Sequence, residues 1–183
     1  PVVIPSSFCL QNRSTAVCVG SGSTRCKVDV ATVGVCCIVN EKLLITGGNG
    51  FIGRYLCREC NKHGIDFLVL SQDGTCAQRG GTGFPANLLD ARSLDRAIEY
   101  FRPHAVIHLA AIASPVHQNI AEVYNVNVVG TENLLNSAQK HLPAGSRVIL
   151  ASTAGVYGNQ PVSHLSEDMP FNPVNHYSYS KMV

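Results

Sequence analysis

The chain has 183 residues, of which 45% are hydrophobic, and its formal net charge is +2. A chain of this length can bury one sizeable core but hardly two. Its 14 Lys and Arg residues form no basic run, so a nucleic-acid partner is not expected. A membrane span is not expected either, because the nearest candidate, residues 28–39, is shorter than the roughly 18 apolar residues required and carries Asp29.

Residues 1–40 differ in composition from the rest of the chain. They hold five of the eight cysteines, separated by Ser, Thr and Gly residues without a sustained periodicity. These spacings match no common zinc pattern, so no metal site is predicted. We interpret residues 1–40 as an irregular or disordered cysteine-rich leader before a folded domain of residues 41–183. A disulfide module and a signal-like apolar segment are the alternatives, although no initiating Met or basic lead precedes such a segment.

Short apolar runs and longer stretches with helical periodicity alternate from Lys42 onward. Helices are predicted from Phe51 to Gly64, through apolar residues at helical spacing, and at residues 92–101 and 121–141. The link from Ser71 to Asn87 is too short for a full helix. Strands are predicted at residues 42–45, 67–70, 105–109 and 147–151, with a weaker one near residues 84–88 that Pro85 interrupts. This alternation predicts an α/β fold with a Rossmann-type, doubly wound parallel sheet and helices on both faces.

A glycine loop follows the first predicted strand, at residues 46–53 with the sequence Thr-Gly-Gly-Asn-Gly-Phe-Ile-Gly. The loop joins a strand to a helix, and glycines there let a phosphate approach the backbone closely. Free N–H groups and the dipole at the helix start attract a pyrophosphate. An ordinary strand-to-helix turn is the simpler interpretation of the loop taken alone.

Tyr177 and Lys181 stand four residues apart near the end of the chain. Residues at this spacing share one face of a helix, so the ammonium can favour the ionised phenolate. Tyr179 provides an internal comparison, because the residue four positions after it is Val183. The spacing alone is common by chance, but together with the glycine loop it indicates nicotinamide redox chemistry.

These motifs resemble the extended short-chain dehydrogenase/reductases, the NAD-dependent epimerase/dehydratase family that modifies sugar nucleotides. The resemblance covers residues 42–183. It implies a C-terminal substrate lobe, which this chain lacks, so that the chain is expected to be an N-terminal fragment truncated after the Tyr-Lys motif. Further landmarks follow in the family's order at residues 87–90 (Asn-Leu-Leu-Asp), 108–111 (His-Leu-Ala-Ala), 127–131 (Asn-Val-Val-Gly-Thr) and 152–158 (Ser-Thr-Ala-Gly-Val-Tyr-Gly).

The resemblance also implies the cofactor contacts. The pyrophosphate is expected against Gly47, Gly50, Phe51, Ile52 and Gly53. Adenine is expected at Asn87 and Leu88, and the nicotinamide ribose beside Leu109, Ala110, Ala111 and Ala113, with Ser152, Tyr177 and Lys181 also on the cofactor side. Simple packing is the alternative for the Leu-Ala-Ala stretch.

Ser71 stands after the second strand, where an NAD-selective enzyme usually presents a carboxylate to the ribose hydroxyls. Its absence removes a group that would repel a 2′-phosphate, so the expected cofactor is NAD or NADP. Arg79 could meet that phosphate or lie solvated at the surface.

The expected mechanism is proton exchange between Tyr177 and a sugar oxygen while a hydride moves to or from nicotinamide. By resemblance, Lys181 assists Tyr177 and holds the ribose, and Thr153 bonds the reacting oxygen unless it only caps backbone. Asn127 could orient the active-site helix or make a satisfied buried hydrogen bond. Four histidines have no ligand spacing and are interpreted as structural or exposed: His104, His108, His117 and His164.

The family's 4,6-dehydratases carry two acidic residues where this chain has Ala154 and Gly155, which disfavours a dehydratase. A nucleotide-sugar 4-epimerase and a 4-keto-6-deoxysugar reductase both remain, and a non-catalytic NAD(P)-binding protein or sensor is the alternative. The resemblance further implies a cytoplasmic protein, with a homodimer as the form of the full-length protein.

Overall fold

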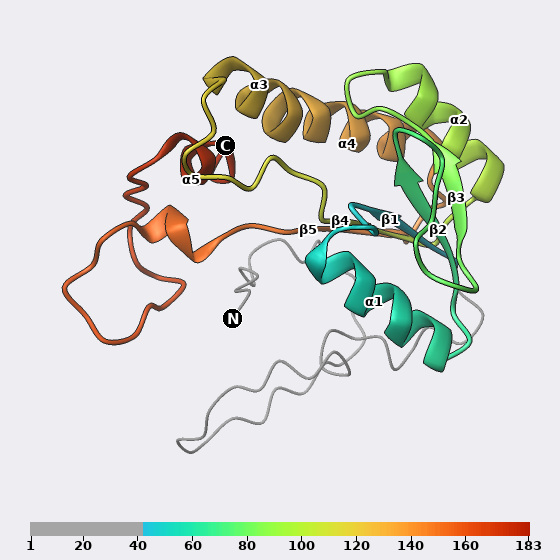
Figure 1. Cartoon of the computed structure of the whole chain (residues 1–183), viewed down its shortest axis with the longest axis horizontal. Coiled ribbons are helices and arrows are strands. Elements are labelled where there is room, and N and C mark those ends of the chain that lie inside the picture. The colour runs from blue at the N-terminus through green and yellow to red at the C-terminus, as the bar shows by residue number, and fades with distance from the viewer. Residues whose placement is uncertain (1–41) are drawn as a thin grey trace.

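The computed structural model describes residues 42–183, so the predicted leader lies outside the described residues. Five parallel strands form one sheet in the order β3-β2-β1-β4-β5 (Figure 1). This is the expected doubly wound order, with the reversal between β1 and β4. The strands are β1 (Lys42–Thr46), β2 (Asp66–Ser71), β3 (Thr82–Pro85), β4 (Ala105–His108) and β5 (Arg147–Leu150).

Helices cover both faces of this sheet, as the alternation predicts. Figure 1 shows α1 on one side and α2, α3 and α4 on the other. A short 3₁₀ turn, η5 (Ala154–Tyr157), follows β5. The helices are α1 (Phe51–Lys62), α2 (Ala91–Phe101), α3 (Ile120–Tyr124), α4 (Gly130–His141) and α5 (His176–Ser180), with a π-helical segment, η4 (Asn125–Val129), between α3 and α4.

Alternate residues of the strands point into two cores, one on each side of the sheet. Leu44 and Leu68 pack with Leu94 and Ile98 of α2, and with Leu134 of α4. Leu43, Ile45, Phe67 and Val69 pack instead with Cys57 and Cys60 of α1. Strands buried on both faces read as continuous apolar runs, which is why the sequence pattern located them.

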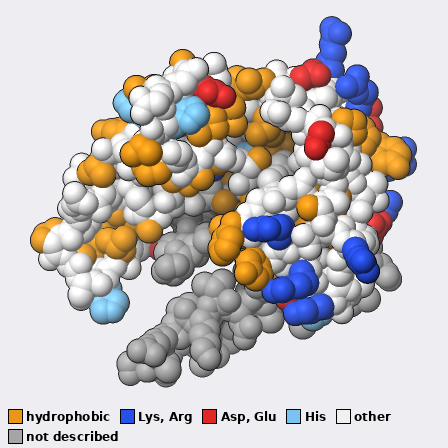
Figure 2. All heavy atoms as spheres, in the orientation of Figure 1, with side chains coloured by type: hydrophobic (Ala, Val, Ile, Leu, Met, Phe, Trp, Pro, Cys, Tyr) orange, Lys and Arg blue, Asp and Glu red, His pale blue; other side chains and the backbone are white. Residues whose placement is uncertain are grey.

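The helix predicted from Phe51 onward is confirmed as α1, and it packs on the sheet through its small residues. Phe51, Ile52 and Tyr55 are at helical spacing, yet all three are exposed, and α1 packs through Gly53, Cys57 and Cys60. Small residues let the helix lie close to the sheet, so the larger side chains face solvent. Apolar and basic side chains lie together over this helix in Figure 2.

Two predicted elements are confirmed with shifted bounds. The third strand, predicted near residues 84–88, lies at Thr82–Pro85, on the sheet edge where Pro85 removes no needed donor. The long helix predicted for residues 121–141 begins at Ile120 and contains the π-helical segment. The chain between β2 and β3 forms no helix, as its length suggested.

Two expected absences concern the described residues only. Between Lys42 and Val183 no helix is long and apolar enough to cross a membrane. In the same stretch no group of three or more His, Cys, Asp or Glu side chains could hold a metal ion.

Candidate active site

A cleft of about 330 Å³ opens at the carboxyl edge of the sheet. Ligands of doubly wound sheets bind at this edge, near the point where the strand order reverses. The structure therefore brings together residues from the ends of β1, β2, β3 and β4. Six of the predicted cofactor residues line the cleft: Gly47, Ser71, Asn87, Leu88, Ala110 and Ala111.

Close backbone packing requires glycine at two positions of residues 46–53, Gly47 and Gly53. Gly47 has φ +70°, and a Cβ there would lie 2.7 Å from the backbone nitrogen of Ala110. A Cβ on Gly53 would overlap the carbonyl oxygen of Gly47 and lie 2.5 Å from the Cα of Gly48. These positions press the loop against the end of β4 and against the start of α1, which leaves its outer side open to a ligand.

The start of α1 suits a pyrophosphate. Arg54 donates the first intrahelical hydrogen bond, to the Gly50 carbonyl (3.0 Å). The N–H groups of Phe51, Ile52 and Gly53 therefore have no intrahelical acceptor, and the helix dipole favours an anion beside them. The side chain of Phe51, the first residue of α1, is 72% exposed. The loop thus fits the phosphates of a dinucleotide.

The proposed catalytic pair is held by α5. The side chain of Asn175 caps this helix by accepting a hydrogen bond from Ser178 N (2.8 Å). Tyr177 and Lys181 are half-buried, and Lys181 keeps a helical backbone as the C-cap. Neither side chain lines the cleft of about 330 Å³.

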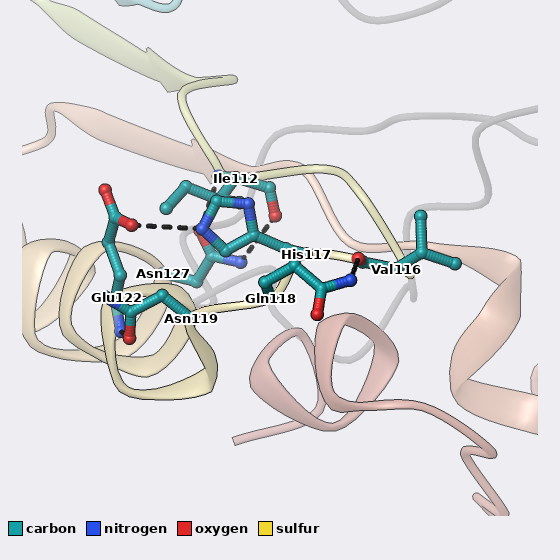
Figure 3. Close-up of polar contacts among 7 residues, drawn as sticks. All are labelled: Ile112, Val116, His117, Gln118, Asn119, Glu122 and Asn127. Carbon is teal, nitrogen blue, oxygen red and sulfur yellow. Dashed lines mark hydrogen bonds and ion pairs between the residues drawn. The ribbon is translucent and has the colours of Figure 1, made fainter.

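Asn127 joins α5 to the loop that follows β4. Its Oδ1 accepts from Ile112 N (2.8 Å), and its Nδ2 donates to Ile112 O (3.1 Å) and to Ser180 Oγ (2.9 Å). Figure 3 shows the paired bonds to Ile112. Ser180 in turn donates to the carbonyl of Tyr177 (2.7 Å). The buried hydrogen bonds of Asn127 are thus satisfied, and one of them reaches the Tyr-Lys helix.

Other predicted residues lie farther from the cleft lining. Leu109 packs into the core beside α1, and Ala113 is exposed. Thr153 accepts a hydrogen bond from Gly155 N (3.2 Å), which is the backbone-capping alternative. Its hydroxyl proton is still available to a substrate oxygen. Ser152 donates to the carbonyl of Lys181 (3.3 Å) and so links the end of β5 to α5.

Sequence reasoning missed two residues that line the cleft. Thr46 and Asn49 line the cleft, and Asn49 holds the β2–β3 loop by donating to Thr75 O (3.0 Å) and accepting from Ala77 N (2.9 Å). His108 was expected to be structural or exposed, and it is buried. Thr46 and Asn49 stand inside the glycine motif, which was the available signal for both.

Glu122 marks the α3 side of the cleft. Its carboxylate pairs with Nε2 of His117 (3.0 Å), and the side chain of Asn119 caps α3 by accepting from Glu122 N (3.1 Å) (Figure 3). Both partners of the ion pair are partly exposed, so the pair contributes little to stability. It does place a carboxylate at the cleft wall.

Burial lowers the pKa of Lys181 below its usual value of 10.5. Below pH 10.5 the unfolded chain holds the proton of the Lys181 ammonium more tightly than the folded chain does. Burying this charge therefore lowers the free energy of unfolding. We expect Lys181→Met to raise the unfolding temperature near neutral pH, with a gain that shrinks as the pH rises towards 10.5. Thermal unfolding of variant and wild type at matched pH tests this. Other titrating groups, such as the Cys57 thiol, affect both proteins equally and so cancel in the difference between the two unfolding temperatures. A lower unfolding temperature for the variant near neutral pH would contradict it.

Burial, and then the charge of Lys181, lower the pKa of His108 from 6.5 to about 4. Between these values the unfolded chain takes up a proton that the folded chain refuses, so stability is complete above pH 6.5 and is lost as the pH falls towards 4. We expect the free energy of unfolding to fall by about 2 kcal/mol between roughly pH 7 and pH 5. Urea unfolding at the two pH values measures this. His108→Gln should flatten the dependence, and an equal slope in both proteins would contradict the assignment.

The glycine loop, the cleft at the strand ends and the Tyr-Lys pair on α5 together define a dinucleotide-binding protein of the short-chain dehydrogenase/reductase type. The model of the NAD dependent epimerase/dehydratase family matches residues 43–183. The chain belongs to this family.

Several relatives are named as sugar-nucleotide enzymes. The GDP-6-deoxy-D-talose 4-dehydrogenase of Aggregatibacter actinomycetemcomitans is 38% identical over 143 residues, which cover 76% of this chain and 45% of the relative. The UDP-glucose 4-epimerase of Thermotoga maritima, solved with UDP-glucose, has a TM-score of 0.71 at 27% identity, covering 77% of this chain and 48% of that one. The Brucella ovis UDP-glucose 4-epimerase, solved with NAD, has a TM-score of 0.70 at 30% identity, covering 78% and 45%. The chain thus spans less than half the length of these relatives.

Proposed function

We propose that this chain binds NAD and supplies the proton-transfer groups of an enzyme that moves a hydride at carbon 4 of a nucleotide-linked sugar. The observation that carries the proposal is the pair of hydrogen bonds that Asn127 makes with Ile112 and Ser180. They connect the helix of Tyr177 and Lys181 to the loop beside the cofactor cleft. The family membership supports the same class of reaction.

One group of residues binds the cofactor. The N–H groups of Phe51, Ile52 and Gly53 hold the pyrophosphate, and Asn87 and Leu88 line the adenine side of the cleft. Bound NAD supplies hydride transfer at its nicotinamide ring.

Proton transfer falls to α5 and its neighbours. Tyr177 exchanges a proton with the sugar oxygen, and the ammonium of Lys181 stabilises the phenolate across one helical turn. The hydroxyl of Thr153 donates a hydrogen bond to the same sugar oxygen and fixes the orientation of that oxygen.

Two reactions are compatible with these groups. A 4-dehydrogenase acting on a GDP-linked 6-deoxysugar is the first candidate, because the relative at 38% identity carries that activity in its name. A UDP-sugar 4-epimerase is the second, because structural relatives with TM-scores of 0.70 and 0.71 are UDP-glucose 4-epimerases. Ala154 and Gly155 carry no proton-transfer group, so elimination of water is disfavoured.

NAD is the proposed cofactor rather than NADP. Ser71 gives no carboxylate to the ribose, and its hydroxyl donates to Thr75 O (2.8 Å). The loop that Ser71 anchors also carries Asp73, which is exposed and accepts two hydrogen bonds from Thr75. A carboxylate two residues after β2 disfavours a 2′-phosphate nearby.

Parallel titrations with NADH and NADPH test the binding part of the proposal. Nicotinamide fluorescence should report saturable binding of NADH by residues 1–183 and weaker binding of NADPH. Absence of binding by both would overturn the dinucleotide assignment, and preference for NADPH would overturn the choice of NAD.

Turnover separates the two reactions in the longest natural polypeptide that contains this chain. A 4-dehydrogenase should form NADH in step with oxidation of GDP-6-deoxytalose. An epimerase should convert UDP-glucose to UDP-galactose without net NADH. Binding of NADH with neither product would favour a non-catalytic NAD-binding protein.

A further inference from the structure

His108 is a buried histidine at the end of β4 with a partner on each ring nitrogen. Its side chain is 1% exposed. Nδ1 lies 2.6 Å from Thr46 Oγ1, at the start of the glycine loop, and Nε2 lies 2.9 Å from Thr131 Oγ1 on α4. We propose that His108 is a positioning residue, held as the neutral Nε2–H tautomer. Through Thr131 and Asn127 it joins the glycine loop to α5, the helix of Tyr177.

The hydroxyl protons fix this tautomer. Thr131 Oγ1 donates its only proton to the carbonyl of Asn127 (2.6 Å), so towards His108 it can only accept. Nε2 must therefore carry a proton. On the other side, Thr46 Oγ1 accepts from Ala110 N (3.1 Å) and keeps its own proton to donate to Nδ1.

The charge of the site excludes the doubly protonated ring. An imidazolium would place a second positive charge inside the protein near Lys181, without a carboxylate among its hydrogen-bond partners. Burial and the Lys181 charge both act in this direction, and they lower the pKa of His108 to about 4. Neutral His108 thus leaves Lys181 as the positive charge of the site.

The resulting chain of hydrogen bonds ends at functional groups on both sides. On the cofactor side it passes through Thr46 to the N–H of Ala110, which lines the cleft. On the catalytic side it passes through Thr131 to Asn127, whose side chain holds Ile112 and Ser180. A shift of the loop is therefore transmitted to the helix of Tyr177 through a rigid, fully satisfied network.

Nitrogen-15 NMR of the wild-type chain tests the tautomer without any substitution. The His108 ring, identified by its absence from the His108→Gln spectrum, should show the neutral Nε2–H pattern near pH 7. An Nδ1–H tautomer or an imidazolium would overturn the proposal. This measurement does not depend on NAD.

A matched pair at Thr131 tests positioning. Thr131→Val keeps the shape but loses the hydroxyl, and Thr131→Ser restores it. The Val variant should weaken NADH binding at least about fivefold and shift the backbone amide signals of Ile112 and Ser180, with both effects absent in the Ser variant.

The consequence for NADH rests on the proposed function, whereas the amide shifts do not. A wild type that fails to bind NADH, with the shifts present, would therefore refute the proposed function alone. Equal behaviour of the Val and Ser variants in the amide signals would refute the positioning role.

Discussion

Replacing Tyr177 by Phe should reduce turnover by about 10²-fold to 10⁴-fold, the usual contribution of a general acid–base group. The substitution removes one oxygen and leaves the aromatic ring. Binding of NADH should stay within about threefold of the wild type, because the phosphates are held by the glycine loop rather than by Tyr177. Steady-state turnover in the longest natural polypeptide that contains this chain, with NADH fluorescence alongside, measures both quantities.

Tyr179→Phe is the matched control for this experiment. Tyr179 lies on the same short helix but is 44% exposed, and Val183 stands where a partner lysine would be. The control should keep wild-type turnover. Equal losses in the two variants would indicate general damage to α5, and wild-type turnover in Tyr177→Phe would remove Tyr177 from the mechanism.

A second large effect is expected for Gly53→Ala, which should destabilise the chain by at least about 3 kcal/mol and abolish NADH binding. The added Cβ overlaps the Gly47 carbonyl oxygen and approaches Gly48, and both obstacles are backbone atoms that cannot rotate away. For a domain of this size the unfolding temperature should fall by roughly 6–12 °C. Thermal unfolding and NADH titration well below the transition measure the two effects separately.

Gly64→Ala provides the comparison within the same chain. Gly64 has φ +64° but no atom within 4 Å of an added Cβ, so only the backbone conformation is strained. The cost should be about 1–2 kcal/mol, and NADH binding should be unchanged. Similar losses of stability and of binding in both variants would show that close packing at Gly53 is not what shapes the loop.

The secondary structure could be predicted well because its signals are local. Apolar runs at residues 42–45 and 67–70 lie within strands buried on both faces, and the weaker third strand, which Pro85 interrupts, is the short strand β3 at the sheet edge. The sequence pattern predicted helix α1 correctly and left its buried face open. Its large apolar residues are at helical spacing, but the small residues of the opposite face are the ones that reach the sheet. The spacing of apolar residues predicts a helix, but it does not show which face of the helix packs against the sheet. That depends on the tertiary packing.

The glycine loop and the Tyr-Lys pair could be located from the sequence alone, because each consists of residues a few positions apart in the chain. The connection between them depends on the folded chain. Thr46 meets His108 across 62 residues, and Asn127 meets Ser180 across 53, because strand order and helix packing bring those segments together. Local spacing carries no information about such contacts, so the network around His108 emerges only from the folded chain.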